Sequence, residues 1–267
     1  MEEVGAKIPP IKVYPDKFKD QVVLITGAAQ GIGEKTVKSF AAQGATVVLV
    51  DLNKEKLQLV AAKVDALGGK ASIQVCNVVR EEEVDHMVRD VISKHERIDI
   101  LVHLAGIYPF IPILNHPTAD YLSVLSVSMD GCFFLTRAIL PHMNKAGYGR
   151  IINTASASVQ HPEPGMAAYV AAKAAVIGFT RVTAVEAGPG VTANVVAPGL
   201  IRTGKTWDSA VAGDGTRPLF DKVVGMQAIK RHGLPEDVSQ MIGFIASPEA
   251  QFITGQVFDV SGGFTFQ

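Results

Sequence analysis

The feature that most constrains the fold of this chain is an alternation of short apolar runs with longer helical patterns. Each run is rich in β-branched residues and too uniformly apolar to have one face in water, so we expect strands that are buried on both sides. Strands that alternate with helices predict a parallel sheet covered by helices on both faces, which is a doubly wound α/β fold. The seven predicted strands are Val22–Ile25, Thr46–Val50, Ala71–Cys76, Ile98–Leu104, Arg150–Thr154, Val191–Val196 and Val257–Val260.

The length of the chain and the positions of its prolines and irregular segments predict the domain organisation. The 267 residues, 48% of them hydrophobic, are enough for one large core, so we expect a single domain over residues 21–267. Residues 1–20 contain three prolines and no sustained period, which predicts an N-terminal arm on the surface or partly disordered. The long segment at about residues 200–230 interrupts the alternation, and we expect it to form a substrate lid.

Charge and cysteine content exclude several classes of function. The net charge is −1 without long runs of one sign, which predicts neither a nucleic-acid partner nor an anionic membrane surface. Cys76 and Cys132 are the only cysteines and lie far apart, so neither a disulfide framework nor a metal site is expected. No run reaches the ~18 apolar residues of a membrane span. We therefore expect a cytoplasmic protein.

A glycine-rich turn follows the first predicted strand. The strand leads into TGAAQGIG (Thr26–Gly33), and a helical pattern continues over Glu34–Ala42. Gly27 suits a tight turn, Gly31 lets the backbone approach a pyrophosphate, and Gly33 lets the helix pack closely on the sheet. The spacing differs from the common G-x-G-x-x-G pattern, so a plain loop of small residues is the alternative interpretation. The strand–turn–helix context favours a dinucleotide site in a Rossmann-type fold.

Asp51 indicates which dinucleotide binds. It closes the second predicted strand, 18 residues after Gly33, which suits a carboxylate that binds the ribose. A carboxylate there repels a 2′-phosphate, and the residues that follow, Leu52 and Asn53, bring no cation. We therefore expect NAD in preference to NADP. Asp51 can also cap the helix that starts near Lys54, and the two roles are compatible.

Tyr169 and Lys173 are the candidate catalytic pair. They are four residues apart on a helix predicted over Gly165–Gly188, so they share one face. A phenol titrates near ~10 in water, and a neighbouring ammonium together with a positively charged nicotinamide would favour the phenolate. Ser156, at the end of the fifth strand, can donate to a substrate oxygen. The alternative is an ordinary surface Tyr–Lys pair.

With these residues in place, the chain resembles the short-chain dehydrogenase/reductase family from Val22 to Gly263. The motifs that carry the resemblance are TGAAQGIG, LAG (Leu104–Gly106), Ser156, the Y-x-x-x-K of Tyr169 and Lys173, and NVVAPGLIRT (Asn194–Thr203). The resemblance implies that Tyr169 is the general acid/base. It also implies that Lys173 binds the nicotinamide ribose and tunes Tyr169, and that Ser156 holds the substrate oxygen.

The resemblance and the glycine turn together give a set of expected cofactor contacts. Asn77 and Val78 would flank the adenine, and the backbone near Ile201 would contact the carboxamide of the nicotinamide. The full set is Gly27, Gln30, Gly31, Ile32, Gly33, Asp51, Leu52, Asn77, Val78, Ala105, Gly106, Tyr169, Lys173, Pro198, Gly199, Ile201 and Thr203.

The sequence departs from the family pattern at two places. Ser128 stands where the family usually has an Asn, thought to hold a water molecule that links the lysine to solvent in a proton relay. A serine hydroxyl can also bind a water, with a shorter reach, so we count Ser128 among the candidate catalytic residues. His103-Leu104 replaces the usual Asn-Asn before Ala105, and we interpret His103 as a satisfied histidine at the edge of the core.

The expected function is an NAD(H)-dependent oxidoreductase that interconverts a secondary alcohol and a ketone. The predicted substrate contacts are Tyr108, His161, Met166 and Trp207, which favour a mainly apolar, cyclic or aromatic substrate, although aromatic residues of the lid can equally pack on the core. Two alternatives stay open: epimerisation or dehydration on the same scaffold, and a nicotinamide-binding regulatory protein. The resemblance implies a homotetramer, and we expect Ala138, Val176 and Val182 on its buried helix faces.

Overall fold

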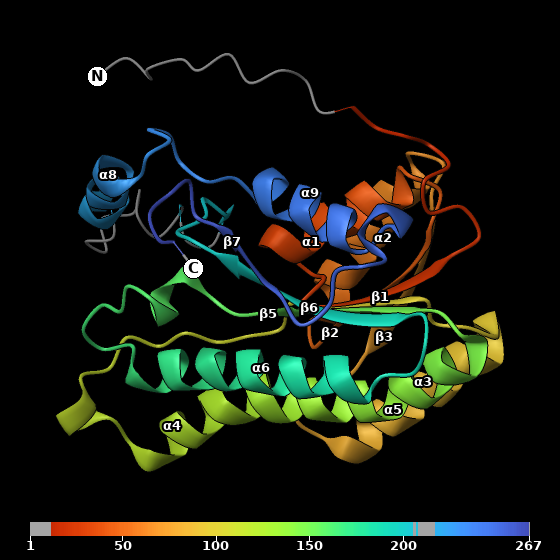
Figure 1. Cartoon of the computed structure of the whole chain (residues 1–267), viewed down its shortest axis with the longest axis horizontal. Coiled ribbons are helices and arrows are strands. Elements are labelled where there is room, and N and C mark those ends of the chain that lie inside the picture. The colour runs from red at the N-terminus through yellow and green to blue at the C-terminus, as the bar shows by residue number, and fades with distance from the viewer. Residues whose placement is uncertain (1–11, 205–206, 208–216, 267) are drawn as a thin grey trace.

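The seven predicted strands all form and lie in one sheet of the computed structural model, which describes residues 12–204, 207 and 217–266. Every neighbouring pair is parallel, in the order β3-β2-β1-β4-β5-β6-β7 (Figure 1). This order confirms the predicted Rossmann-type, doubly wound fold. The strands are β1 Val22–Thr26, β2 Thr46–Asp51, β3 Lys70–Val75, β4 Ile100–His103, β5 Gly149–Thr154, β6 Val191–Pro198 and β7 Val257–Val260.

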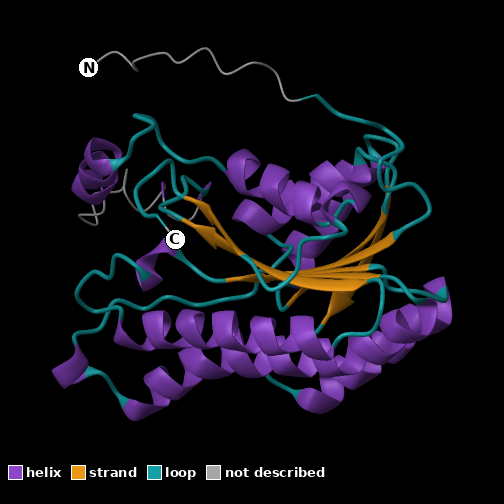
Figure 2. Cartoon of the chain, viewed as in Figure 1, coloured by secondary structure: helices purple, strands orange, loops and turns teal. Residues whose placement is uncertain are grey.

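Helices cover both faces of the sheet (Figure 2). The described helices are α1 Gly31–Ala41, α2 Lys54–Asp65, α3 Glu81–His95, α4 Thr118–Leu125, α5 Gly131–Ala146, α6 Ala167–Glu186, α8 Arg217–Met226 and α9 Pro235–Ile245. One layer holds α1, α2 and α9, and the other holds α3, α4, α5 and α6 (Figure 1). In β1, Val23 and Ile25 pack toward the first layer, while Val22 and Leu24 pack toward the second. Burial on both faces explains the uniformly apolar strands.

The strand order changes direction between β1 and β4. The chain first builds outward from β1 to β2 and β3, then returns to place β4 on the other side of β1. In open sheets of this kind, ligands bind in the crevice beyond the carboxyl ends of the strands at such a switch point. The loops that follow β1, β4, β5 and β6 meet there.

The helical stretch from Thr118 to Ala146 is interrupted. Residues Ser126–Asp130 form a π-helical turn, hereafter the π turn, in which the Gly131 amide donates to the Ser126 carbonyl five residues earlier. Ser128 lies at the centre of this turn and is fully buried. A π turn changes the backbone pairing within a helix and frequently marks a functional site.

The described part of the predicted arm is anchored to the core. Phe18 is fully buried, its ring lies 4.7 Å from that of Phe40, and its amide donates to the Gln43 carbonyl at 2.8 Å. The folded region therefore begins before residue 21, because one aromatic side chain fills a gap beside α1. Residues 1–11 lie outside the described part of the chain.

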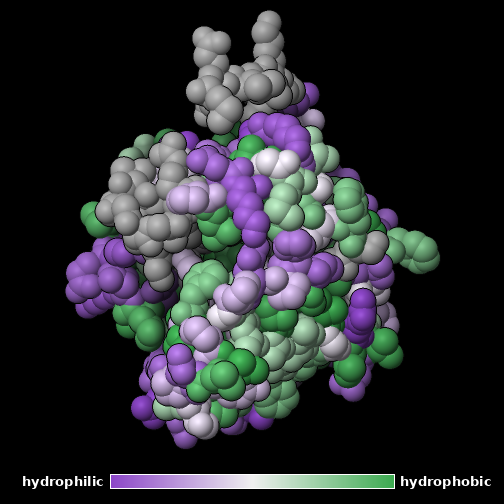
Figure 3. All heavy atoms as spheres, turned by 90° about the vertical axis from the view of Figure 1, so that its left-hand side faces the viewer, coloured by the Kyte–Doolittle hydropathy of each residue, from purple (hydrophilic) through white to green (hydrophobic). Residues whose placement is uncertain are grey.

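The second helical layer carries apolar side chains on parts of its outer surface, on α5 and α6, and hydrophobic residues are prominent in the lower half of the face that Figure 3 shows. By length and composition, Thr118–Ala146 and Ala167–Glu186 could each cross a membrane, but their inner faces pack on the sheet and on each other. Val182 is 54% exposed and Val185 is 85% exposed on α6. The expectation for Val176 was wrong: it is fully buried, because it falls on the same helical stripe as Lys173 and Thr180. Ala138 is half-buried.

Candidate active site

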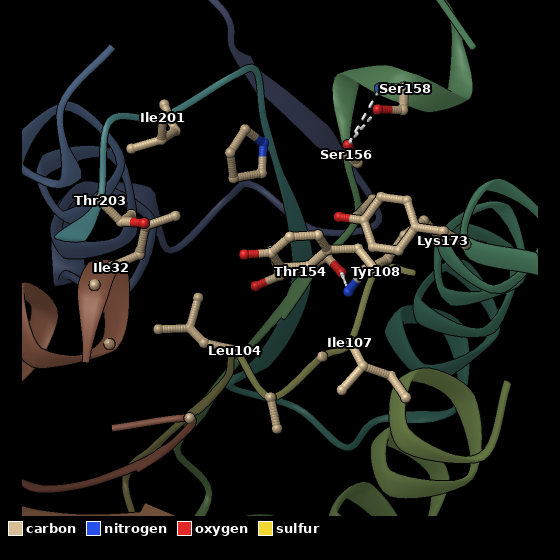
Figure 4. A pocket seen from close by; sticks show the side chains of 18 of the residues that line it. Ile32, Leu104, Ile107, Tyr108, Thr154, Ser156, Ser158, Lys173, Ile201 and Thr203 are labelled. Atoms are coloured by element: carbon tan, nitrogen blue, oxygen red, sulfur yellow. Dashed lines mark hydrogen bonds between the residues drawn. The ribbon is translucent and has the colours of Figure 1, made fainter. Parts of the chain in front are cut away.

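One cavity of about 690 Å³ lies at the carboxyl edge of the sheet. It brings together all the residues predicted to contact the cofactor, from Gly27 in the first loop to Thr203 after β6. Three of the four predicted substrate residues, Tyr108, His161 and Met166, line the same cavity. Figure 4 shows Ile32, Ile201 and Thr203 on one side of it and Ser156, Tyr108 and Lys173 on the other. The cavity therefore unites loops that are far apart in the sequence.

The glycine turn leaves a helix end open toward this cavity. Gly31, at φ +58°, begins α1, and its N-cap residue Gln30 makes no capping hydrogen bond through its side chain. The first amides of the helix are therefore available to an anion such as a pyrophosphate. A Cβ atom on Gly33 would lie 2.0 Å from the Gly27 carbonyl oxygen, so only glycine permits this closed turn. The turn fits a dinucleotide and is not merely a loop of small residues.

Asp51 lies at the end of β2, beside the glycine turn. Its carboxylate accepts hydrogen bonds from the amides of Ala29 at 3.3 Å and Asn53 at 3.1 Å. The helix α2 is capped by Asn53, whose side chain accepts from the Lys56 amide at 2.9 Å. Asp51 is therefore not the cap of that helix, and its carboxylate lines the cavity.

Tyr169, Lys173 and Ser156 meet where β5 and α6 face the cavity. The Lys173 ammonium is 5.7 Å from the centre of the Tyr169 ring and donates to the Thr154 carbonyl at 2.7 Å. The Ser156 hydroxyl accepts from the Ser158 amide at 3.2 Å, which fixes it at the start of a short helical turn. A buried lysine and a serine are thereby held beside one phenol, an arrangement that can exchange a proton with an oxygen in the cavity.

The charges in this group differ from the expectation. Burial raises the pKa of Tyr169, which a hydrogen bond with Ser156 partly offsets, and the Tyr108 hydroxyl acts in the same direction as burial. Burial lowers the pKa of Lys173 to about 8. We expected Lys173 to lower the pKa of the phenol. In the chain alone burial is the main influence on the pKa of Tyr169, and the Lys173 ammonium donates to the Thr154 carbonyl.

Two predicted site residues do not line the cavity. Ser128 is buried behind it in the π turn, and its hydroxyl has no hydrogen-bond partner within the described structure. Trp207 instead packs between the rings of Phe220 and His232, 5.4 and 5.1 Å away, with the Arg202 guanidinium 3.9 Å from its centre. These neighbours, one of them on α8, leave the indole half-buried. The middle of the predicted lid, residues 205–206 and 208–216, lies outside the described residues.

Sequence reasoning missed several residues of this region. Thr26 accepts the amides of Leu104 and Ala105, both at 3.2 Å, and so joins the first loop to the loop after β4. Its position in the glycine motif was the available signal. Phe264, near the C-terminus, lines the cavity with no local signal in the sequence. In the described part of the chain, no three His, Cys, Asp or Glu side chains gather as a metal site.

Comparison with known proteins gives the family. The family model described as enoyl-(acyl carrier protein) reductase matches residues 27–265. The chain is 37% identical to the 3-oxoacyl-[acyl-carrier-protein] reductase of Thermotoga maritima, covering 92% of this chain and 98% of that protein. It is 36% identical to the meso-2,3-butanediol dehydrogenase of Serratia marcescens, with 93% and 96% covered.

Solved structures agree with the sequence comparison. The crystal structure of an NAD⁺-bound xylitol dehydrogenase superposes with a TM-score of 0.86 at 30% identity, covering 92% of this chain and 100% of that one. The fold, the motifs and the arrangement of Ser156, Tyr169 and Lys173 around one cavity agree with these matches. The chain belongs to the short-chain dehydrogenase/reductase family, and it is an oxidoreductase of that family.

Proposed function

We propose that this protein is an NAD(H)-dependent enzyme that interconverts a secondary alcohol and a ketone. The observation that carries the proposal is the meeting of Tyr169, Lys173 and Ser156 with the glycine turn in one cavity. A group able to exchange a proton therefore lies next to a site suited to a dinucleotide. We assign the substrate oxygen to the space beside Ser156 and Tyr169.

The cofactor assignment follows from the shape and charge of the cavity wall. The open start of α1 would hold the pyrophosphate, Asp51 the adenine ribose, and Lys173 the nicotinamide ribose. Ile201 and Thr203 would border the nicotinamide, which when bound accepts or delivers the hydride. Asp51 favours NAD, because its carboxylate accepts hydrogen bonds from ribose hydroxyls and repels a 2′-phosphate. The likeness to an NAD⁺-bound xylitol dehydrogenase supports the same choice.

The chain's own residues would then manage the proton. In alcohol oxidation, Tyr169 accepts the proton of the carbinol hydroxyl, and in ketone reduction it returns one to the carbonyl oxygen. Ser156 donates a hydrogen bond to that oxygen and orients it. Lys173, when charged, favours the phenolate of Tyr169, and a positively charged nicotinamide would act in the same direction. Both raise the acidity of a phenol that burial alone would keep protonated.

The substrate end of the cavity supports a mainly apolar substrate. Its wall includes Tyr108, Phe110, Met166, Phe220 and Phe264. The polar side chains that join them include His161, whose ring packs on Phe264, and Glu163, which pairs with Lys222 at 2.9 Å. Such a wall suits a cyclic or aromatic alcohol. A 3-oxoacyl thioester is the second candidate, because one relative is a reductase of that class.

The remaining features of the proposal concern assembly and location. We propose a homotetramer in which the apolar outer surfaces of α5 and α6, including Phe133, Val182 and Val185, are buried between copies. We further propose one catalytic domain over residues 21–267 with a lid at about 200–230, acting in the cytoplasm on a small molecule. Light scattering at micromolar concentration tests the assembly, and a monomer would contradict it.

Absorbance at the reduced-nicotinamide band tests the proposal. In the oxidation direction the protein is given NAD and a panel of secondary alcohols, and in the reduction direction NADH with ketones and a 3-oxoacyl thioester. We expect net reduction of NAD with apolar secondary alcohols. An epimerase or dehydratase would show substrate conversion without net NADH. A regulatory protein would bind NAD and convert no substrate, so each alternative has its own outcome.

A further inference from the structure

His103 is a buried titratable residue that the proposed chemistry does not use. It is the last residue of β4 and is 2% exposed. Its ring lies between the first loop, through Thr26, and the π turn, where a Cβ on Gly131 would come within 3.4 Å of the ring atom Cε1. This histidine therefore bridges the dinucleotide loop and the interrupted helix.

The Thr26 hydroxyl fixes the protonation of the ring. Its oxygen is 2.8 Å from His103 Nδ1 and accepts the amides of Leu104 and Ala105. A hydroxyl has two acceptor positions and one hydrogen. Because the two amides occupy both acceptor positions, the hydrogen of Thr26 must go to Nδ1. The imidazole proton therefore lies on Nε2.

The other ring nitrogen faces the π turn. Burial lowers the pKa of His103 to about 3, so the ring is neutral and Nε2–H is its one donor. The backbone carbonyls of Val127 and Ser128 lie close enough to raise that pKa slightly, although Nε2 completes no hydrogen bond of normal geometry within the described residues. The Ser128 hydroxyl, fully buried in the same turn, is also unpaired there. Sequence analysis predicted a satisfied histidine, and this holds for only one of its two nitrogens.

Lys173 belongs to the same buried region. Its charge helps to lower the pKa of His103, and it interacts with Cys132, one helical turn after Ser128. The titratable groups that face Lys173 are thus Tyr169 on its own helix, Cys132 on α5 and His103 on β4. Buried polar groups are nearly always paired with protein or ordered water. Nε2–H of His103 and the hydroxyl of Ser128 are therefore expected to share the carbonyls of the turn or a water held against them.

We propose that His103 is a positioning residue that couples the dinucleotide loop to the π turn behind Lys173. Through Nδ1 it is held by Thr26, and its Nε2–H is directed at the backbone carbonyls of Val127 and Ser128 or at a water held against them. The π turn is thereby kept at a fixed distance from the catalytic lysine. This inference rests on the proposed function, because it assigns His103 a part in the reaction of Lys173 and Tyr169. The competing interpretation is that His103 only fills space.

Three variants separate these interpretations. His103→Gln carries an amide long enough to place a donor near the position of Nε2, whereas His103→Asn offers polar atoms only near the position of Nδ1. His103→Leu removes both. We expect kcat within about threefold of wild type for Gln and about tenfold lower for Asn, because the buried donor toward the π turn is lost. The affinity for NAD should stay within about twofold in both, because the amides of Leu104 and Ala105 still hold Thr26 in place.

The pH profile of kcat provides a readout that space filling alone would not change. In this profile, His103→Asn should shift the apparent pKa of the coupled Lys173–Tyr169 pair by at least about half a pH unit. His103→Gln should keep the wild-type apparent pKa. Thermal unfolding shows whether each variant is folded, and Asn and Gln stay informative if Leu is not. Equal kcat and superimposable pH profiles for folded wild type, Asn and Gln would overturn the inference.

NMR of the protein with ¹⁵N-labelled histidine tests the geometry without any reaction. We expect His103 to carry its proton on Nε2 and to stay neutral across the neutral pH range. A proton on Nδ1 would overturn the inference even if the enzyme is active. If wild type proves inactive with every alcohol while Nε2 is protonated and His103→Asn perturbs the amides of Val127 and Ser128, the proposed function falls and the coupling stands. An active wild type that loses turnover in Tyr169→Phe but not in His103→Asn gives the opposite result.

Discussion

The two ends of the cavity are held in shape by different means. At the dinucleotide end the backbone determines the shape, because the missing side chain of Gly33 lets α1 start against the Gly27 carbonyl. At the catalytic end the packing of side chains determines the shape. Lys173 is buried, its pKa is lowered to about 8, and its ammonium donates to the Thr154 carbonyl. A backbone site follows from glycine spacing, whereas a side-chain site depends on how distant segments pack.

Tyr169→Phe should have the largest effect, and it should affect turnover at the catalytic end without affecting the dinucleotide end. It removes the group that exchanges the substrate proton, so turnover should fall by at least ~100-fold. Binding of NAD, measured by titration of the protein's fluorescence, should change little, because the dinucleotide end is intact. Nearly unchanged hydride transfer would show that another residue is the acid/base, and the catalytic assignment would fall while the cofactor site remained.

Gly33→Ala should damage the opposite end. The added Cβ would lie 2.0 Å from the Gly27 carbonyl, so the turn must open. Overpacking of this kind costs about 1–3 kcal/mol, which corresponds to a loss of NAD affinity of roughly 5- to 150-fold. The control is Gly243→Ala in α9, where an added Cβ meets no atom within 4 Å. Equal NAD affinity of the two variants would contradict the backbone account.

The same contrast decides how much the sequence could predict. The number of strands, their parallel direction and the glycine turn followed from local patterns, although α1 begins earlier than expected, at Gly31. The π turn was missed because its five residues, Ser126–Asp130, include no glycine or proline that would mark a break in a helix. Trp207 was predicted to contact the substrate, whereas it packs on Phe220 and His232, and no local pattern in the sequence indicates these contacts. Val176 was assigned to the wrong side because an apolar residue fits either face of a helix.

Asp51→Ala tests the choice of cofactor. Losing hydrogen bonds to a charged carboxylate costs about 1.5–3 kcal/mol, so kcat/KM with NAD should fall about tenfold or more, while NADP gains from the loss of repulsion. Asp65→Ala, at the end of α2 and away from the cavity, is the matched control. Native efficiency that is equal or better with NADP would refute the predicted preference for NAD.

Lys173→Met should reveal what the buried ammonium costs in stability. Because the pKa of Lys173 is lowered from 10.5 to about 8, the unfolded chain binds more protons between these values, and wild-type stability rises with pH across that window. Below about pH 8 the wild type bears the full cost of the buried charge, about 3 kcal/mol from the pKa shift. The stability gain of the variant is smaller than this, because its Thr154 carbonyl loses the hydrogen bond from Lys173. The inactive variant should therefore unfold at a higher temperature at pH 7, by an amount that shrinks toward pH 10. A variant advantage that does not change with pH would contradict this.

Ser128 should give the smallest effect. Ser128→Asn should leave turnover similar or raise it, because an amide reaches further from the π turn toward Lys173 than a hydroxyl does. Ser128→Ala removes the hydroxyl and should lower turnover by about threefold, since the hydrogen bond expected between this hydroxyl and a relay water is lost. Steady-state kinetics over a range of pH would measure both. No change in turnover or in its pH dependence for Ser128→Ala would make this position merely structural.

The most direct test of the central claim follows a single hydrogen atom. A secondary alcohol from the active panel, deuterated at its carbinol carbon, is incubated with the protein and NAD, and the reduced nicotinamide is analysed by NMR. The account predicts that deuterium arrives at C4 of the nicotinamide, on one face of the ring, and that the ketone forms in equal amount. NADH without deuterium, or substrate that exchanges or rearranges while the cofactor stays oxidised, would contradict it.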